Sequence, residues 1–289
     1  MPAEIPPRPD PSTPSAIGSA TSSTSGAPMR LDHWVYGVTP GKGYDIKAVS
    51  TGLNLAFYEE KIQGFYTPIR GESLQDGKVD LVMVHPAPSL QEVLFSVVGR
   101  GPDDEMGRPT FASHTAVTPL DALRAGTIEL ESVERALRAY DQAQGNAVGE
   151  VPPLEVATVS PSSLEVRTAG LRRCLTFAAA ETLVTRLLTT PSGRTLVLMR
   201  NSVPEQRIRS LRLLLSTLHL ACGLPWFTSM SDAPTASALD HFQVVLSPRG
   251  VRADNSWTLL DAALDRPALP RPGGQESVYR ALERCFSEG

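Results

Sequence analysis

Five short runs rich in β-branched and aromatic residues occupy the first half of this sequence, and they constrain its fold more than any other feature. The runs cover residues 31–39, 44–49, 79–85, 92–98 and 111–117. Residues 40–43 (Pro-Gly-Lys-Gly) separate the first two runs, and turn-forming residues between two such runs are typical of a β-hairpin. We therefore expect a sheet that opens on a hairpin.

Longer segments repeat their apolar residues at helical spacing. Between residues 129 and 142, one stripe is formed by Leu130, Val133, Leu137 and Tyr140. Similar spacing predicts helices at residues 53–65, 204–222 and 275–286, and a further helix that begins at about Ser162 or Leu171 and ends at Leu188. Further strands are expected at residues 154–159, 194–200, 226–230 and 241–246. The predicted fold class is therefore α/β (α+β), with mixed sheets and helices in two domains.

Two segments with few large apolar side chains bound these domains. Residues 1–29 contain seven prolines and nine serines or threonines, so they bury too little surface to offset the entropy cost of ordering, and we expect a disordered tail. Residues 143–153 are rich in glycine and proline, which is typical of a linker. The predicted domains are residues 30–147 (N-terminal, α+β) and residues 154–289 (C-terminal, α/β).

The composition argues against several classes of protein. The chain has 289 residues and a net charge of −4, so it lacks the basic excess by which most nucleic-acid-binding proteins attract phosphate. Its apolar runs are shorter than the roughly 20 residues of a membrane-spanning helix, and its first residues do not read as a secretion signal. The cysteines Cys174, Cys222 and Cys285 lie far apart, which suits a reducing compartment. We expect a cytoplasmic protein that neither binds nucleic acid nor inserts into a membrane.

Motifs for nucleotide, cofactor or metal binding are incomplete. Residues 37–43 approach a phosphate-binding loop, but one residue too few separates the glycines, and glycine rather than Ser or Thr follows the lysine. The sequence contains no GxSxG motif, which argues against a serine hydrolase. The histidines stand singly, without the short spacing of metal ligands: His33, His85, His114, His219 and His241. We therefore expect no cofactor and no metal.

The densest polar cluster lies between two predicted strands. Asp103, Asp104 and Glu105 are followed by Arg108, and His114 stands on the next strand. Carboxylates and an imidazole can serve acid–base catalysis, so one alternative function is a hydrolase that uses Asp103, Asp104, Arg108 and His114. The other interpretation is a solvated acidic loop in which Arg108 pairs locally. Loops held between rigid strands are also common recognition sites.

Charge is distributed unevenly along the chain. Residues 30–150 contain 11 basic and 17 acidic residues, whereas residues 160–215 contain nine arginines and three acidic residues. The asymmetry is compatible with solvated helix faces, with a docking surface for a charged partner, or with contact between the two halves. The candidate partner surface comprises Asp103, Asp104, Glu105, Arg108, Arg172, Arg173, Arg207, Arg209 and Arg212.

Several short motifs, taken in order, resemble one bacterial family. They are Tyr36-Gly37 with residues 41–44 (Gly-Lys-Gly-Tyr), residues 50–53 (Ser-Thr-Gly-Leu), the Asp103-Asp104 loop with Arg108, residues 111–117 (FASHTAV) and residues 209–217 (RSLRLLLST). Together they resemble the N-terminal and middle domains of bacterial GTPase-associated adaptor proteins. The resemblance covers residues 31 to about 245.

This resemblance implies a protein that acts beside Ras-like GTPases as an adaptor rather than as an enzyme. Our leading hypothesis is a non-enzymatic adaptor or regulator that binds a small Ras-like bacterial GTPase or a related signalling complex. Two alternatives stay open. One is the hydrolase described above, and the other is a structural subunit of a larger assembly, with the N-terminal tail as a tether.

Overall fold

The computed structural model describes somewhat more than half of the chain. The described residues are 26–39, 41–58, 80–87, 89, 91–144, 147–159, 175–190, 193–198, 228–230, 244–247 and 257–287. The expected helix at residues 204–222 lies outside these ranges, and so do residues 1–25.

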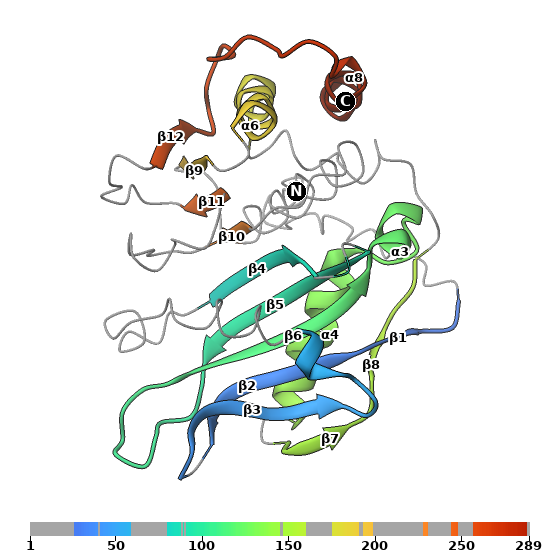
Figure 1. Ribbon diagram of the computed structural model, residues 1–289, viewed down its shortest axis with the longest axis vertical. Coiled ribbons are helices and arrows are strands. Elements are labelled where there is room, and N and C mark those ends of the chain that lie inside the picture. The colour runs from blue at the N-terminus through green and yellow to red at the C-terminus, as the bar shows by residue number, and fades with distance from the viewer. Residues whose placement is uncertain are drawn as a thin grey trace, which may run out of the picture.

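Among the described residues, ten strands form one sheet, whose arrangement is drawn in Figure 1. They are β2 (His33–Thr39), β3 (Gly43–Ser50), β4 (Asp80–Pro86), β5 (Glu92–Arg100), β6 (Phe111–Pro119), β7 (Gly149–Val151), β9 (Arg194–Leu198), β10 (Thr228–Met230), β11 (Val244–Ser247) and β12 (Trp257–Asp261). Their order across the sheet is β12-β9-β11-β10-β4-β5-β6-β2-β3-β7. A separate antiparallel pair is formed by β1 (Met29–Leu31) and β8 (Leu154–Val156).

The two halves of the sheet differ in strand direction. In the N-terminal half, β4, β5, β6, β2 and β3 are antiparallel neighbours, as expected for strands joined by hairpins and short loops. In the C-terminal half, β12, β9, β11 and β10 are parallel. An antiparallel pairing of β10 with β4 joins the halves. The structure confirms the expected α/β class with a mixed sheet.

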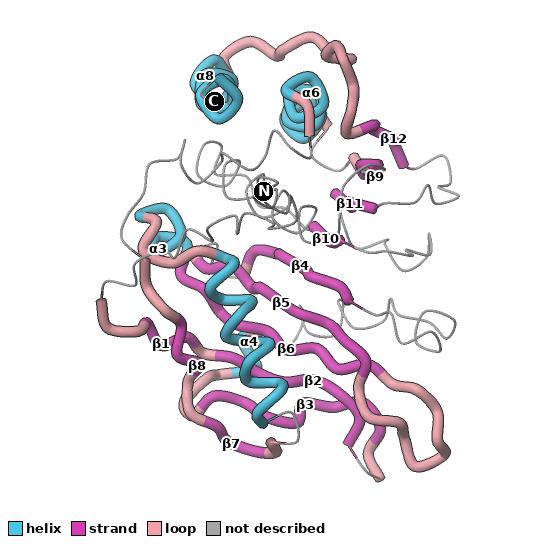
Figure 2. The backbone as a smooth tube through the Cα atoms, turned by 180° about the vertical axis from the view of Figure 1, so that it is seen from behind, coloured by secondary structure: helices cyan, strands magenta, loops and turns pink. Residues whose placement is uncertain are grey.

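Helices cover one face of this sheet. They are α3 (Leu120–Ala125), α4 (Leu130–Gln144), α6 (Phe177–Thr189) and α8 (Glu276–Ser287). Seen from behind, α4 crosses the antiparallel strands, while α6 lies next to the parallel strands and α8 lies beside α6 (Figure 2). The stripe predicted on α4 is confirmed, because Leu130, Val133 and Leu137 are all buried in the core beneath that helix.

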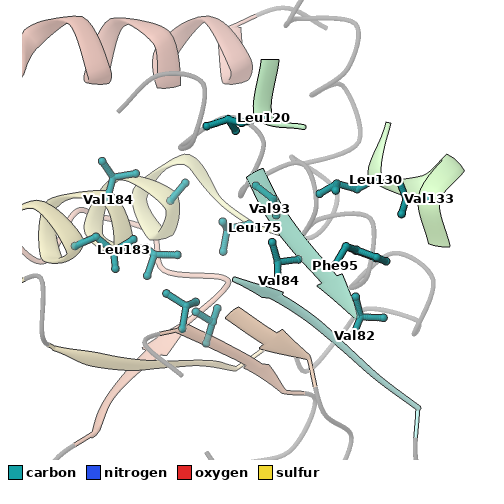
Figure 3. Close-up of a cluster of buried hydrophobic side chains, with 14 of the residues drawn as sticks. Val82, Val84, Val93, Phe95, Leu120, Leu130, Val133, Leu175, Leu183 and Val184 are labelled. Atoms are coloured by element: carbon teal, nitrogen blue, oxygen red, sulfur yellow. The ribbon is translucent and has the colours of Figure 1, made fainter. Parts of the chain in front are cut away.

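The central strands bury side chains on both faces. Leu94 and Phe95 are consecutive residues of β5, point to opposite faces and are both 0% exposed. Phe95 belongs to the core shared with α4 and α6, where Val84 and Leu183 also lie (Figure 3). Leu94 belongs to a second core on the opposite face, together with Trp34 of β2. The sheet is therefore a central layer between two apolar cores.

The segment expected to link two domains takes part in the N-terminal fold. Strand β7 pairs in parallel with β3, and β8 pairs with β1. Val151, Leu154 and Val156 are buried, and it is this apolar alternation within a glycine- and proline-rich segment that makes it pack. The division into domains at residues 147–154 stays a prediction, but two short strands occupy most of the segment, separated by Pro152 and Pro153 and paired in different sheets.

The described chain also begins before the expected end of the tail. Gly26 is its first residue, and Met29, which we assigned to the disordered tail, starts strand β1. Met29 packs against the core and Leu31 is buried in it, so these two side chains attach the segment to the fold.

One local prediction differs from the structure, and one strand was not predicted. The expected helix at residues 53–65 contains a single 3-10 turn, Leu55–Phe57, and its positions from 59 onward lie outside the described residues. The strand β12 was not predicted. None of the described helices is both long and apolar enough to span a bilayer.

Leucine truncation measures how strongly the central strand depends on its two cores. Leu94→Ala removes a fully buried side chain and should lower the free energy of unfolding by about 2–5 kcal/mol. Leu259→Ala, in β12, is the matched control; Leu259 is 54% exposed, so its loss should cost less than about 1 kcal/mol. Urea unfolding of both variants tests this, and equal losses would contradict the assigned burial.

Candidate functional site

Two segments far apart in the sequence meet at one end of the antiparallel strands. They are residues 101–110, between β5 and β6, and residues 41–44, which comprise the turn of the β2–β3 hairpin and the start of β3; together we call them the loop–hairpin surface. The Gly41 N–H donates to Glu105 Oε1 at 3.0 Å, and the Phe111 N–H donates to the Tyr44 hydroxyl at 3.2 Å. Both segments project beyond the sheet at the lower left of Figure 1.

Hydrogen bonds within the loop hold its shape. Asp104 Oδ1 accepts the backbone N–H groups of Met106 at 2.9 Å and of Arg108 at 2.8 Å. Asp104 Oδ2 accepts Arg108 Nε at 2.7 Å. The pKa of Asp104 lies below its ordinary value, first because the Arg108 backbone N–H donates to it and also because the Arg108 side chain does. The expected local pairing of Arg108 is therefore present.

Two glycines are required by this loop. Gly107 has φ = 71°, a left-handed conformation that other residues adopt at a cost. Gly101 has no room for a side chain, because an added Cβ would lie 2.6 Å from Thr110 Oγ1 and 3.0 Å from the Phe111 backbone. The sequence around the acidic residues thus dictates a compact, preformed loop.

The surface combines apolar side chains with charge pairs. Met106 is 75% exposed at the tip of the loop, and Tyr44 is also exposed. Tyr44 stacks on Phe111, with ring centroids 4.5 Å apart, so its ring is held in place. Arg100 pairs with Asp103 at 2.9 Å. Met and Tyr are enriched in protein–protein interfaces, and here they lie beside charge pairs that are already satisfied.

His114 is not part of this surface. It lies on β6, 1% exposed, and its two ring nitrogens contact His33 and Asp141. The structure therefore corrects the hydrolase hypothesis in its geometry: Asp103, Asp104 and Arg108 bond among themselves or with neighbours in an exposed loop, and His114 has no free nitrogen to act with them.

A buried chain of hydrogen bonds contains His114 instead. His33 Nε2 contacts the Pro152 carbonyl oxygen at 2.9 Å, and His33 Nδ1 contacts His114 Nε2 at 2.7 Å. His114 Nδ1 contacts Asp141 Oδ1 at 2.9 Å. The Tyr140 ring lies edge-on to both imidazoles. We call the three side chains and the Pro152 carbonyl the histidine chain; it connects β2, β6, the end of α4 and the segment between β7 and β8.

Burial is the main determinant of the protonation state of His33. The pKa of this imidazole is lowered to about 4, chiefly by burial and also by the neighbouring His114, while the Pro152 carbonyl and Asp141 act in the opposite direction. His33 is therefore neutral at pH 7.

Sequence reasoning missed the histidine chain because its members are far apart in the sequence. His33 and His114 are separated by 81 positions and become neighbours only through strand register, in which His33 pairs with Ala116 and Val35 with His114. Antiparallel pairing of the first and fifth predicted runs, with their in-and-out alternation, is the signal that could have found it.

The remaining candidate residues receive no structural support. Arg172, Arg173, Arg207, Arg209 and Arg212 lie outside the described residues. In the described ranges, no three His, Cys, Asp or Glu side chains are placed to hold a metal ion. A scan against protein-family models finds no match to this chain, and a search of curated proteins finds no relative.

Glycine substitution tests the preformed loop. Gly101→Ala forces a Cβ against Thr110 and the Phe111 backbone, and it should lower the free energy of unfolding by about 1–3 kcal/mol. The matched control is Gly273→Ala, where an added Cβ meets no atom within 4 Å and stability should stay the same or rise slightly. Thermal or urea unfolding measures both, and a neutral Gly101→Ala would contradict the close packing.

Proposed function

We propose that this protein is a non-enzymatic adaptor that binds a small Ras-like bacterial GTPase, or a signalling complex that contains one, through the loop–hairpin surface. The observation that carries the proposal is Met106, an exposed apolar side chain at the tip of a loop that Asp104 holds in shape. The preformed loop would lose little conformational entropy on binding, which favours affinity.

The resemblance to GTPase-associated adaptor proteins supports the same surface. Its motifs at residues 41–44, Asp103-Asp104 with Arg108, and residues 111–117 are far apart in the sequence; Gly41 and Glu105 are separated by 64 positions, and Tyr44 and Phe111 by 67. In the fold, Gly41 bonds to Glu105 and Tyr44 stacks on Phe111. Residues of three of the five motifs that suggest the family thus meet at the proposed partner surface.

The chemistry of the surface defines the partner's site. Met106 is flexible and polarizable, so it fits an apolar pocket whose exact shape need not be complementary in advance. The Arg100–Asp103 and Arg108–Asp104 pairs lie around it and would form the polar rim of the contact. We propose an apolar depression on the GTPase, bordered by polar side chains, as the site that receives Met106.

Truncation of Met106 tests this function. Met106→Ala should weaken binding to the cognate GTPase at least tenfold, or about 1.4 kcal/mol, because it removes the central apolar contact. Titration calorimetry should be run with Ras-like GTPases of the source genome in the GDP-bound and GTP-analogue-bound states, starting with any encoded beside this gene. The control is Val148→Ala, another exposed apolar side chain away from this surface, which should bind like the unmodified protein.

Two results would overturn the proposal. One is that no Ras-like GTPase binds in either nucleotide state. The other is that a GTPase binds but Met106→Ala and Val148→Ala have the same affinity for it, which would move the contact to another part of the chain.

A further inference from the structure

The contacts of the histidine chain determine how many hydrogens it must hold. Each of its three contacts joins two atoms that are otherwise both acceptors, so each needs one hydrogen between them. The contacts are His33 Nε2 with the Pro152 oxygen, His33 Nδ1 with His114 Nε2, and His114 Nδ1 with Asp141 Oδ1. Three hydrogens are therefore required.

Ordinary protonation states at neutral pH supply only two. A neutral imidazole carries one ring hydrogen, and an ionised carboxylate carries none. Two neutral histidines with ionised Asp141 would leave one contact with two acceptors facing each other, which is repulsive inside a protein. The complete chain thus holds one additional hydrogen and has no net charge.

The additional hydrogen belongs at the Asp141 end. The carbonyl oxygen of Pro152 can only accept, so His33 Nε2 carries the hydrogen of the neutral His33 ring, and its Nδ1 accepts from His114 Nε2. The contact between His114 Nδ1 and Asp141 then takes the additional hydrogen. The Asp141 side chain is 40% exposed, so this end of the chain is open to exchange with solvent.

The charged groups that act on His33 belong to the histidine chain itself. His114 and Asp141 are the charged groups that shift the pKa of His33, and the phenol of Tyr140 on α4 packs beside them. The remaining charged side chains on α4, β3, β7 and β8 are Glu131, Glu134, Arg135, Arg138, Asp45, Lys47, Glu150 and Glu155. Glu134 and Arg138 pair with each other at 2.8 Å.

We propose that the histidine chain takes up one proton when the protein folds above about pH 7, and that this proton makes the attachment of α4 to the sheet sensitive to pH. In the unfolded chain, both histidines titrate near pH 6.5, whereas the aspartate loses its proton near pH 4 and is therefore ionised at neutral pH. Above pH 7 the folded state therefore binds one more proton than the unfolded state, and stability falls as pH rises.

In acid, the dependence of stability on pH is reversed. Below about pH 6 both unfolded histidines are protonated, so the unfolded state binds one more proton than the folded chain does, and stability falls as pH falls. The histidine chain should thus contribute a stability maximum between about pH 6 and 7, with the unfolding equilibrium constant rising up to about tenfold per pH unit on either side.

Asp141→Asn is the decisive variant. The amide of an asparagine can donate to His114 Nδ1, so all three contacts are then complete with both imidazoles neutral, and the fold is preserved. Urea unfolding at pH 7, 7.5, 8 and 8.5 should show the alkaline dependence in the unmodified protein and its loss in this variant. Below pH 6 the variant should become steeper, up to about a hundredfold per pH unit, because two protons are then released on folding.

Asp265→Asn is the control, since Asp265 is an exposed carboxylate far along the chain, and its variant should keep the alkaline dependence of the unmodified protein. Nitrogen-15 NMR of the histidine rings provides a second readout. It should show His33 protonated at Nε2 alone, and the His114 signals should respond to Asp141→Asn. Equal alkaline dependence in the Asp141→Asn and unmodified proteins, or His33 protonated at Nδ1 alone, would overturn the proposal.

Discussion

Burial of the central strands on both faces is the constraint on which the rest of this structure depends. Leu94 and Phe95 are adjacent, point in opposite directions and are both fully buried, so β5 requires an apolar cover on each side. One side is covered by helices from both halves of the sequence, with residues of α4, α6 and α8 in one core. Helices from both halves of the sequence contribute to this one core. Each half alone would expose apolar surface that the other half covers, and we therefore expect the two halves to fold cooperatively.

The same constraint positions both sites. Strands β5 and β6 are held by neighbours on either side, so the loop between them starts and ends at fixed points, and its internal hydrogen bonds hold the remainder. The histidine chain lies further along β2 and β6, beneath α4. One site is exposed and preformed, which suits recognition, while the other is buried and holds a polar network in the core, where each contact needs a hydrogen-bond partner.

Local patterns predicted much of this architecture. The β2–β3 hairpin, the strands β4 to β6, and the helices α4, α6 and α8 all appear near the expected residues, because their apolar periodicity matches the side of the element that packs. Long-range pairing was not predictable in this way. Strands β1 and β8 are three residues each and gain their order from each other, and residues 147–153 contain the glycine and proline of a linker although Val151 pairs and packs.

For the candidate sites too, contacts that are local in the sequence were predictable and long-range contacts were not. The loop of Asp103, Asp104 and Arg108 was predictable, since its interactions are local in sequence. His114 was grouped with that loop because it is close in sequence, whereas strand register and the α4 face place it with His33 and Asp141. The contacts of a side chain on a strand depend on which strands are its neighbours and which helix packs over it. Local patterns in a single sequence do not predict those neighbours.

Native-state hydrogen exchange in increasing urea tests most directly whether the shared sheet makes the protein one cooperative unit. If it does, backbone amides in the β5–β6 ladder and in the β9–β12 ladder will converge on a single free energy and a single urea dependence, equal to those of global unfolding. The account is contradicted if the β9–β12 amides exchange through a separate opening of lower free energy while those of β5 and β6 stay protected.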